Sequence, residues 1–88
     1  MKLKFEASFH RDIKRVKDKL VLDKAFEIVK SLKYADSFHE IPNLKKLKAH
    51  PNAYSIRIGG FRLGLFLEKD TLILSRLLNR KDIYKKFP

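Results

Sequence analysis

The sequence feature that most constrains the fold is the stretch YSIRIGGFRLGLF, residues 54–66, in which apolar and polar residues alternate on both sides of two adjacent glycines. Alternation of this kind is typical of a strand with one buried face, and a Gly-Gly pair between two such runs indicates a two-residue hairpin turn. With the turn at Gly59-Gly60, Arg57 lies directly opposite Arg62. Like charges in that arrangement destabilise a strand pair, so the position of the two arginines requires an explanation.

The two faces of this hairpin differ in composition. One face is continuously apolar, and we expect it to form the core with Tyr54, Ile56, Ile58, Phe61, Leu63, Leu65 and Leu67. The opposite face carries Ser55, Arg57, Arg62, Gly64 and Phe66. A bound phosphodiester would convert the repulsion between the arginines into bidentate hydrogen bonds, and Gly64 would leave room for the backbone of the ligand. The alternative is that both arginines are solvated, or paired with Glu68 or Asp82.

The N-terminal part of the chain predicts a strand followed by two helices. Leu3 and Phe5 alternate with charged residues, as in a strand with one buried face. Apolar residues then recur at helical spacing, and the polar run at residues 17–19 indicates a break that produces a helical hairpin. Ser8 and Asp23 are the expected N-caps of the two helices. The apolar stripe expected to cover the sheet consists of Phe9, Ile13, Val16, Leu20, Leu22, Phe26, Val29 and Leu32.

The remaining segments complete an antiparallel sheet. Residues 37–40 have capping-box spacing, but Pro42 limits a helix there to about one turn. Residues 43–52 are rich in lysine and predict a basic loop or short edge strand, and residues 71–78, TLILSRLL, predict a third strand. The expected fold is α+β, with an N-terminal strand and a helical hairpin packed on an antiparallel β-meander. At 88 residues, the chain is expected to form a single domain spanning 1–88.

The charge of the chain restricts its partners. It has 21 Lys and Arg residues against 10 Asp and Glu, and the net charge of +11 favours nucleic acid or a strongly acidic protein as a partner. Cysteine is absent, which excludes disulfides, thiolate zinc sites and thiol redox chemistry. No segment has the apolar length of a signal peptide core or a membrane span, so we expect a cytoplasmic protein without a membrane partner.

The C-terminal segment LLNRKDIYKKF, residues 77–87, would bring Arg80 and Tyr84 to the rim of the arginine face if the last two strands are neighbours. Together with this segment, the N-terminal strand, the SFHRDIKRV helix and the run EIPNLKKLKAHPNAYSIRIGGFRLGLF closely resemble the RelE-type toxins of bacterial toxin–antitoxin modules, in the RelE/ParE superfamily. The resemblance covers nearly the full length. Its most specific elements are IPNLKKLK, the R-I-G-x-F/Y-R hairpin and the R-K-D-I-Y ending.

This resemblance implies an mRNA interferase that enters the ribosomal A site and cuts the message. The 2′-hydroxyl of the substrate ribose attacks the adjacent phosphate in this family, without a metal or other cofactor. By motif position, Arg62 stabilises the phosphate in its transition state and Arg57 is a second catalytic cation. Arg80 and Tyr84 assist proton transfer and stacking. Because a guanidinium is a poor general base, with a pKa above about 12, the arginines are assigned to charge stabilisation, and His50 is the candidate for acid–base work.

Further residues are expected to contact RNA. In the family the concave basic face of the sheet holds the message, and the basic segment before the hairpin is expected to grip the RNA backbone. The residues expected to make these contacts are Lys45, Lys46, Lys48, Ser55, Phe66 and Lys81. Phe66 either stacks on a base or contacts a covering segment. Three positions depart from the family's commoner residues: Ser55 replaces a lysine of some relatives, Asn79 a histidine and Phe61 a tyrosine.

The resemblance also implies a partner and leaves two alternatives. The expected partners are the ribosome, mRNA and a cognate antitoxin that is acidic at least in the segment that wraps this chain, and that becomes ordered on binding. One alternative is a ParE-like DNA gyrase inhibitor with the same fold and no RNA cleavage. The other is a non-catalytic RNA-binding or ribosome-binding module whose basic face only holds phosphates.

Overall fold

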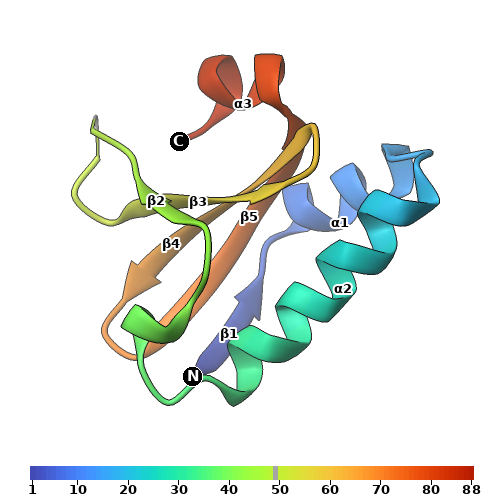
Figure 1. The fold of residues 1–88 in the computed structure, drawn as a ribbon. Helices are drawn as coiled ribbons and strands as arrows, with labels where there is room; N and C mark the ends of the chain where they lie inside the picture. Colours follow the sequence, from blue (N-terminus) through green and yellow to red (C-terminus); the bar gives the residue numbers. More distant parts are fainter. Residues whose placement is uncertain (49) are drawn as a thin grey trace.

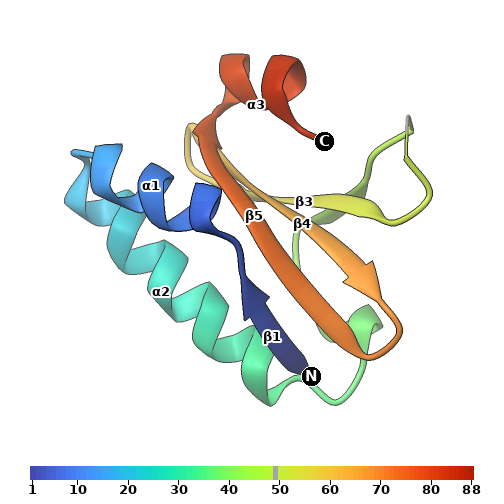
Figure 2. The same ribbon diagram turned by 180° about the vertical axis from the view of Figure 1, so that it is seen from behind.

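The computed structural model describes residues 1–48 and 50–88, which form a layer of helices packed on a twisted sheet (Figures 1 and 2). The elements are β1 (Lys2–Phe5), α1 (Ala7–Arg15), α2 (Lys19–Tyr34), a 3-10 turn (Phe38–Glu40), β2 (Leu44–Lys46), β3 (Ala53–Ile58), β4 (Phe61–Glu68), β5 (Thr71–Asn79) and α3 (Arg80–Lys86). The strand order is β1-β5-β4-β3-β2, with β1 parallel to β5 and the other pairs antiparallel. The predicted α+β architecture is confirmed.

The central hairpin has the predicted register. Arg57 lies opposite Arg62, and Ile58 lies opposite Phe61 on the two sides of the Gly59-Gly60 turn. The backbone of Gly59 has a φ of 58°, a conformation that glycine adopts without steric cost. All seven residues of the predicted apolar face belong to the core or pack against it. The lysine-rich segment supplies β2 as a short edge strand, one of the two predicted possibilities.

Both predicted helix caps are wrong. Helix α1 begins at Ala7, and the Ser8 hydroxyl instead donates a hydrogen bond to the carbonyl of Ser75 at 2.6 Å. The N-cap of α2 is Asp18, whose carboxylate accepts from the backbone N–H groups of Leu20 and Val21. The break between the helices therefore lies at the predicted polar run, but α2 starts earlier than a cap at Asp23 would allow. The capping residue, Asp18, is the acidic member of the polar run, and helix N-termini favour acidic residues.

The apolar stripe was predicted correctly on α1 and partly wrongly on α2. Phe9 and Val16 are buried, whereas Leu20 is 72% exposed and Phe26 is 55% exposed. The break resets the helical phase, so that α2 faces the sheet with Val21, Ala25, Ile28 and Leu32, all buried or packed against the core. The predicted stripe was continued across the break without this change of phase, so its positions on α2 are displaced by part of a helical turn.

A buried ion pair, which was not predicted from the sequence, holds α1 against β5. Asp12 is 2% exposed and accepts hydrogen bonds from Arg76 Nε at 2.8 Å, from Arg76 Nη2 at 3.1 Å and from the backbone N–H of Leu77 at 2.9 Å. The register between β4 and β5 shifts at this point, since Gly64 pairs with Arg76 and the next residue of β4 pairs with Leu74. The pKa of Arg76 is raised, mainly by the hydrogen bonds to Asp12.

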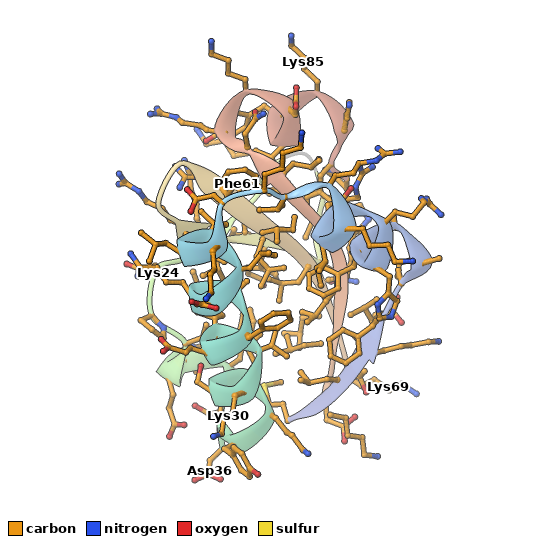
Figure 3. All side chains as sticks on the ribbon, turned by 90° about the vertical axis from the view of Figure 1, so that its right-hand side faces the viewer. Lys24, Lys30, Asp36, Phe61, Lys69 and Lys85 are labelled. Atoms are coloured by element: carbon orange, nitrogen blue, oxygen red, sulfur yellow. The ribbon has the colours of Figure 1, made fainter. Side chains whose placement is uncertain are left out.

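Figure 3 looks onto the helical side of the protein, with α2 and α1 in front of the sheet, and it shows Lys85 on α3 extending away from the protein. Helix α3 lies at one end of the sheet, and the chain after it turns back towards the β2–β3 connection (Figure 1). Among the described residues, no helix has both the length and the apolar character needed to cross a membrane.

Candidate active site beside the C-terminal helix

The start of α3 is fixed by a reciprocal cap. Asn79, the last residue of β5, accepts a hydrogen bond from the backbone N–H of Asp82 at 2.9 Å and donates from its amide to the Asp82 carboxylate at 3.0 Å. This arrangement satisfies a free N–H of the first turn and places a carboxylate at the positive end of the helix. The strand therefore passes directly into α3, and Arg80 is its first residue.

Helix α3 and the residue after it cover part of the arginine face. Ile83 and Phe87 are buried there against Ala53, with Leu47, Phe66 and Leu78 packed around them. We call these six residues the C-terminal cluster. A Cβ atom at Gly64 would lie 2.8 Å from Cδ2 of Phe87. The expectation that Gly64 leaves room for a ligand backbone is therefore wrong, because the Phe87 ring occupies that space.

Two of the residues expected to contact RNA lie at this covered part of the face. Ser55 is 5% exposed, so its hydroxyl is not presented to a ligand in this conformation. Phe66 is half-buried, and its ring centroid lies 5.1 Å from that of Phe87. Of the two roles considered for Phe66, contact with a covering segment is the one that the packing supports.

Three cations act electrostatically on the Tyr84 hydroxyl. Tyr84 is 58% exposed, and hydrogen bonding from the Arg62 side chain has the largest effect on it, lowering the pKa of the phenol, while partial desolvation acts in the opposite direction. The positive charges of Lys45, Arg62 and Arg80 lower this pKa further, because each favours the phenolate. We call Lys45, Arg62, Arg80 and Tyr84 the cationic cluster. Its members come from β2, β4 and α3, which explains why no local motif contains them all.

The basic segment borders a hollow next to this cluster. The hollow has a volume of about 300 Å³, and its lining consists of Lys45, Lys46, Leu47, Lys48, Tyr84, Phe87 and Pro88. The three lysines are exposed, while Leu47 is half-buried and Phe87 is buried. An apolar floor with ammonium groups at the rim is suited to a nucleobase flanked by phosphates. Lys81 is also exposed, on the first turn of α3.

Arg57 is the predicted catalytic residue that the structure does not bring into the cluster. It lies opposite Arg62 in register, but it lines a separate hollow of about 540 Å³ together with Lys24 and Glu27 of α2 and with Asn43. The side chains that act on the Tyr84 hydroxyl are Lys45, Arg62 and Arg80 alone among those described. The face thus holds a cluster around Arg62, with Arg57 beside it.

Neither of these arginines is neutralised within the described chain. Over residues 1–48 and 50–88, the ion pairs within 4 Å join Lys2 to Asp70 and Arg76 to Asp12. The pairing of Arg57 or Arg62 with Glu68 or Asp82, considered as an alternative, is therefore not seen. Arg76 has its carboxylate, whereas the group on which Arg62 acts is the Tyr84 hydroxyl. The cationic cluster is chemically able to bind an anion.

His50 lies beside the C-terminal cluster. Its Nδ1 accepts a hydrogen bond from the backbone N–H of Asn52 at 3.1 Å, and its ring is edge-on to Phe66 with 5.3 Å between centroids. The Nε2 atom is therefore the one left for contact with a substrate. Across the described residues, no group of three or more acidic, histidine or cysteine side chains is arranged to hold a metal ion.

Two features of this region were not foreseen from the sequence. Asp12 stands three residues after Phe9 on the buried side of α1, and an acidic residue at a core position is a signal of a buried cation. Phe87 follows Ile83 by four residues, the spacing that puts two side chains on one helix face. Neither signal identifies its partner, because Arg76 and Gly64 lie far away in the sequence from Asp12 and Phe87.

No family model matches the chain. It is 34% identical over 89 residues to Toxin RelE3 of Methanocaldococcus jannaschii, with full coverage of both chains. Its fold is similar to a chain of the RelB–RelE antitoxin–toxin complex from Methanococcus jannaschii, with a TM-score of 0.83, 32% identity and coverage of 97% of this chain and 99% of that chain. A chain of the archaeal RelE–RelB complex from Pyrococcus horikoshii OT3 shares the fold, with a TM-score of 0.70, 17% identity and coverage of 90% and 93%.

Proposed function

This chain belongs to the RelE family of toxins, and from that premise we propose that its 88 residues form one toxin domain that cleaves mRNA in the ribosomal A site. The observation that carries the proposal is that Tyr84 shares a hollow with the lysines of the basic segment, while the charges of Lys45, Arg62 and Arg80 lower the pKa of its hydroxyl and Arg62 has no carboxylate partner among the described residues. Such a cluster is suited to a phosphate whose negative charge increases during reaction. The ribosome as target would place its action in the cytoplasm.

The proposed reaction is an internal transesterification. The 2′-oxygen of the substrate ribose forms a bond to the adjacent phosphorus, and the bond from phosphorus to the 5′-oxygen of the next nucleotide breaks. The products are a 2′,3′-cyclic phosphate and a 5′-hydroxyl. Arg62 and Arg80 stabilise the charge that develops on the phosphorane oxygens, which such reactions require more than any covalent contribution from the protein.

Proton transfer in this scheme is assigned to Tyr84. Surrounding cations lower the pKa of its phenol, so that the group donates a proton more readily to the leaving 5′-oxygen than an ordinary tyrosine does. The exposed ring is also free to stack on a base. His50 is half-buried against Phe66 and keeps Nε2 free, and it stays the candidate for accepting the 2′-hydroxyl proton.

The partner that neutralises the toxin is proposed to be an antitoxin, as the names of the similar complexes state for those proteins. A third hollow, of about 970 Å³, runs between the edge strand β1 and helix α2. Its exposed aromatic residues are Phe5, Phe26 and Tyr34, and Lys2, Lys30 and Lys33 line it too. Apolar surface next to ammonium groups fits an amphipathic antitoxin segment that carries acidic residues, and charge complementarity would steer it there.

Induced expression of the chain, followed by primer extension on a translated message, tests the function. The proposal predicts cuts at A-site codons with the wild-type chain, and their loss with Arg62→Ala or Arg80→Ala. Normal ribosome binding without any cuts would favour a binding module instead. Trapped DNA breaks with intact message would favour gyrase inhibition.

A further inference from the structure

Position 64 is occupied by glycine because there is no space for a side chain there. Its backbone does not have the positive φ that favours glycine, which among the described glycines is found at Gly59. An added Cβ at Gly64 would instead lie 2.8, 2.9 and 3.0 Å from three atoms of the Phe87 ring. The missing side chain therefore creates a notch in β4, and the Phe87 ring fills it. The ring is 6% exposed and also contacts Phe66.

Helix α3 depends on this contact for its place on the sheet. It has 7 residues, and a helix of that length is not stable without packing. Its buried side chain is Ile83, and the backbone N–H of Phe87 donates to the Ile83 carbonyl at 2.9 Å. The helix is thus held by the Asn79 cap at its start and by Phe87 at its end. Tyr84 and Arg80 lie between these two attachments.

We propose that Phe87, seated in the notch at Gly64, is a positioning residue that sets where α3 lies on the sheet and thereby brings Tyr84 and Arg80 to Arg62. Phe87 also lines the hollow beside the basic segment, but its positioning role acts through the helix and it does not take part in the chemistry. The effect of Phe87 on catalysis rests on the proposed function. The effect of Phe87 on the geometry of the cationic cluster is independent of that function.

A methyl group at Gly64 gives a defined perturbation of this contact. In Gly64→Ala the ring must move, because carbon atoms do not approach to 2.8 Å, and α3 moves with it. At a site that depends on positioning, displacing a catalytic group by about 1 Å lowers the reaction rate on the order of 10²-fold. In the double variant Gly64→Ala/Phe87→Leu, the smaller side chain leaves space for the methyl. The double variant should therefore recover part of the loss.

The matched control is Gly60→Ala. Nothing lies within 4 Å of a Cβ at Gly60, its φ is not positive, and the substitution retains the carbonyl that accepts from the Arg80 N–H at 2.9 Å. It therefore makes the same chemical change in the same hairpin without disturbing Phe87. Circular dichroism and thermal unfolding of each variant establish that the fold is retained.

Two measurements test the inference. The first is the single-turnover cleavage rate of ribosome-bound message, which should fall at least about 10-fold in Gly64→Ala, recover in the double variant and stay unchanged in Gly60→Ala. The second is the NMR titration of the Tyr84 ring carbon, assigned with Tyr84→Phe, which does not depend on the reaction. Its pKa should rise in Gly64→Ala towards the ordinary value of about 10 and return in the double variant.

The outcomes separate the two proposals. If the wild-type chain does not cleave but Tyr84 responds to Gly64→Ala as expected, the cleavage function is wrong and the positioning role stands. If Tyr84 titrates identically in the wild type and in a folded Gly64→Ala variant, the positioning role is wrong, whatever the cleavage rates. An equal loss of cleavage in Gly60→Ala would also overturn it.

Discussion

Replacing Asp12 by alanine should destabilise this protein more than any change to its surface ion pair. The substitution leaves the guanidinium of Arg76 and the backbone N–H of Leu77 without their acceptor. Breaking a buried ion pair by removing one partner costs about 3–5 kcal/mol. The lower end, about 3 kcal/mol, applies here because the Arg76 side chain keeps 22% exposure and regains some water.

That loss is large for a chain of this size. A domain of 88 residues has a free energy of unfolding on the order of 4–13 kcal/mol. Since each kcal/mol shifts the midpoint by about 4–8 °C in domains of this length, Asp12→Ala should lower the melting temperature by about 12–24 °C. Urea denaturation followed by circular dichroism, with the slope of the transition compared between variants, measures the difference directly.

The exposed pair between Lys2 and Asp70 is the control. Its atoms are 3.7 Å apart and both side chains are more than two-thirds exposed, so Lys2→Ala should cost less than about 1 kcal/mol. The double variant Asp12→Ala/Arg76→Ala should cost less than the sum of the two single variants, because it leaves no buried charge unpaired. A loss in Asp12→Ala no greater than that in Lys2→Ala would refute the reasoning.

Three further predictions concern the site and the partner surface. Arg62→Ala should reduce the single-turnover cleavage rate by about 10²–10³-fold with ribosome binding retained. Arg62→Lys should recover part of this rate, since an ammonium restores the charge without the bidentate geometry. Equal rates in the wild type and Arg62→Ala would contradict the assigned role. Arg62→Gln should raise the pKa of Tyr84, because the group that lowers this pKa most is gone. In the wild type, the alkaline fall in cleavage should therefore begin at a lower pH than an ordinary tyrosine would give, as the phenol loses its proton. An NMR titration of Tyr84 that is unchanged by Arg62→Gln would refute the effect of Arg62 on this group. Phe26→Glu should weaken binding of the acidic antitoxin by at least about 10-fold in calorimetry without changing cleavage. Leu20→Glu should not weaken it, because Leu20 is an even more exposed apolar residue of α2 that lies outside the hollow between β1 and α2. Equal effects of the two substitutions would show that this hollow is not the docking surface.

The hairpin could be predicted in detail because its information is local. Alternation with period two and the Gly-Gly turn fix which residues face the core and which cross-strand partners they have, so the position of Arg57 opposite Arg62 was predicted correctly. The helical caps and the phase of α2 were harder, because Asp18 and Asp23 are both plausible caps and the choice between them depends on how the helix packs.

The site was only partly predictable because it is assembled from distant segments. Arg80 and Tyr84 were expected at the rim of the arginine face because the last two strands were expected to be neighbours, and the resemblance assigned catalytic roles to them and to Arg57 and Arg62. Lys45, expected only to contact RNA, also acts on Tyr84, whereas Arg57 does not. The open space assumed at Gly64 was wrong, since a glycine in a strand indicates close approach but does not say by what. Here the approaching group is the chain's own Phe87, 23 residues later in the sequence.

The most direct test of the central claim is an analysis of the RNA ends formed when the purified chain acts on ribosomes that hold a defined message. The proposed reaction predicts a 2′,3′-cyclic phosphate and a 5′-hydroxyl at the A-site codon. A message with a 2′-deoxy nucleotide at the cleaved position, or a chain with Arg62→Ala, should give neither end. Ends with a 3′-hydroxyl and a 5′-phosphate, or cleavage of the 2′-deoxy message at the normal rate, would contradict the account.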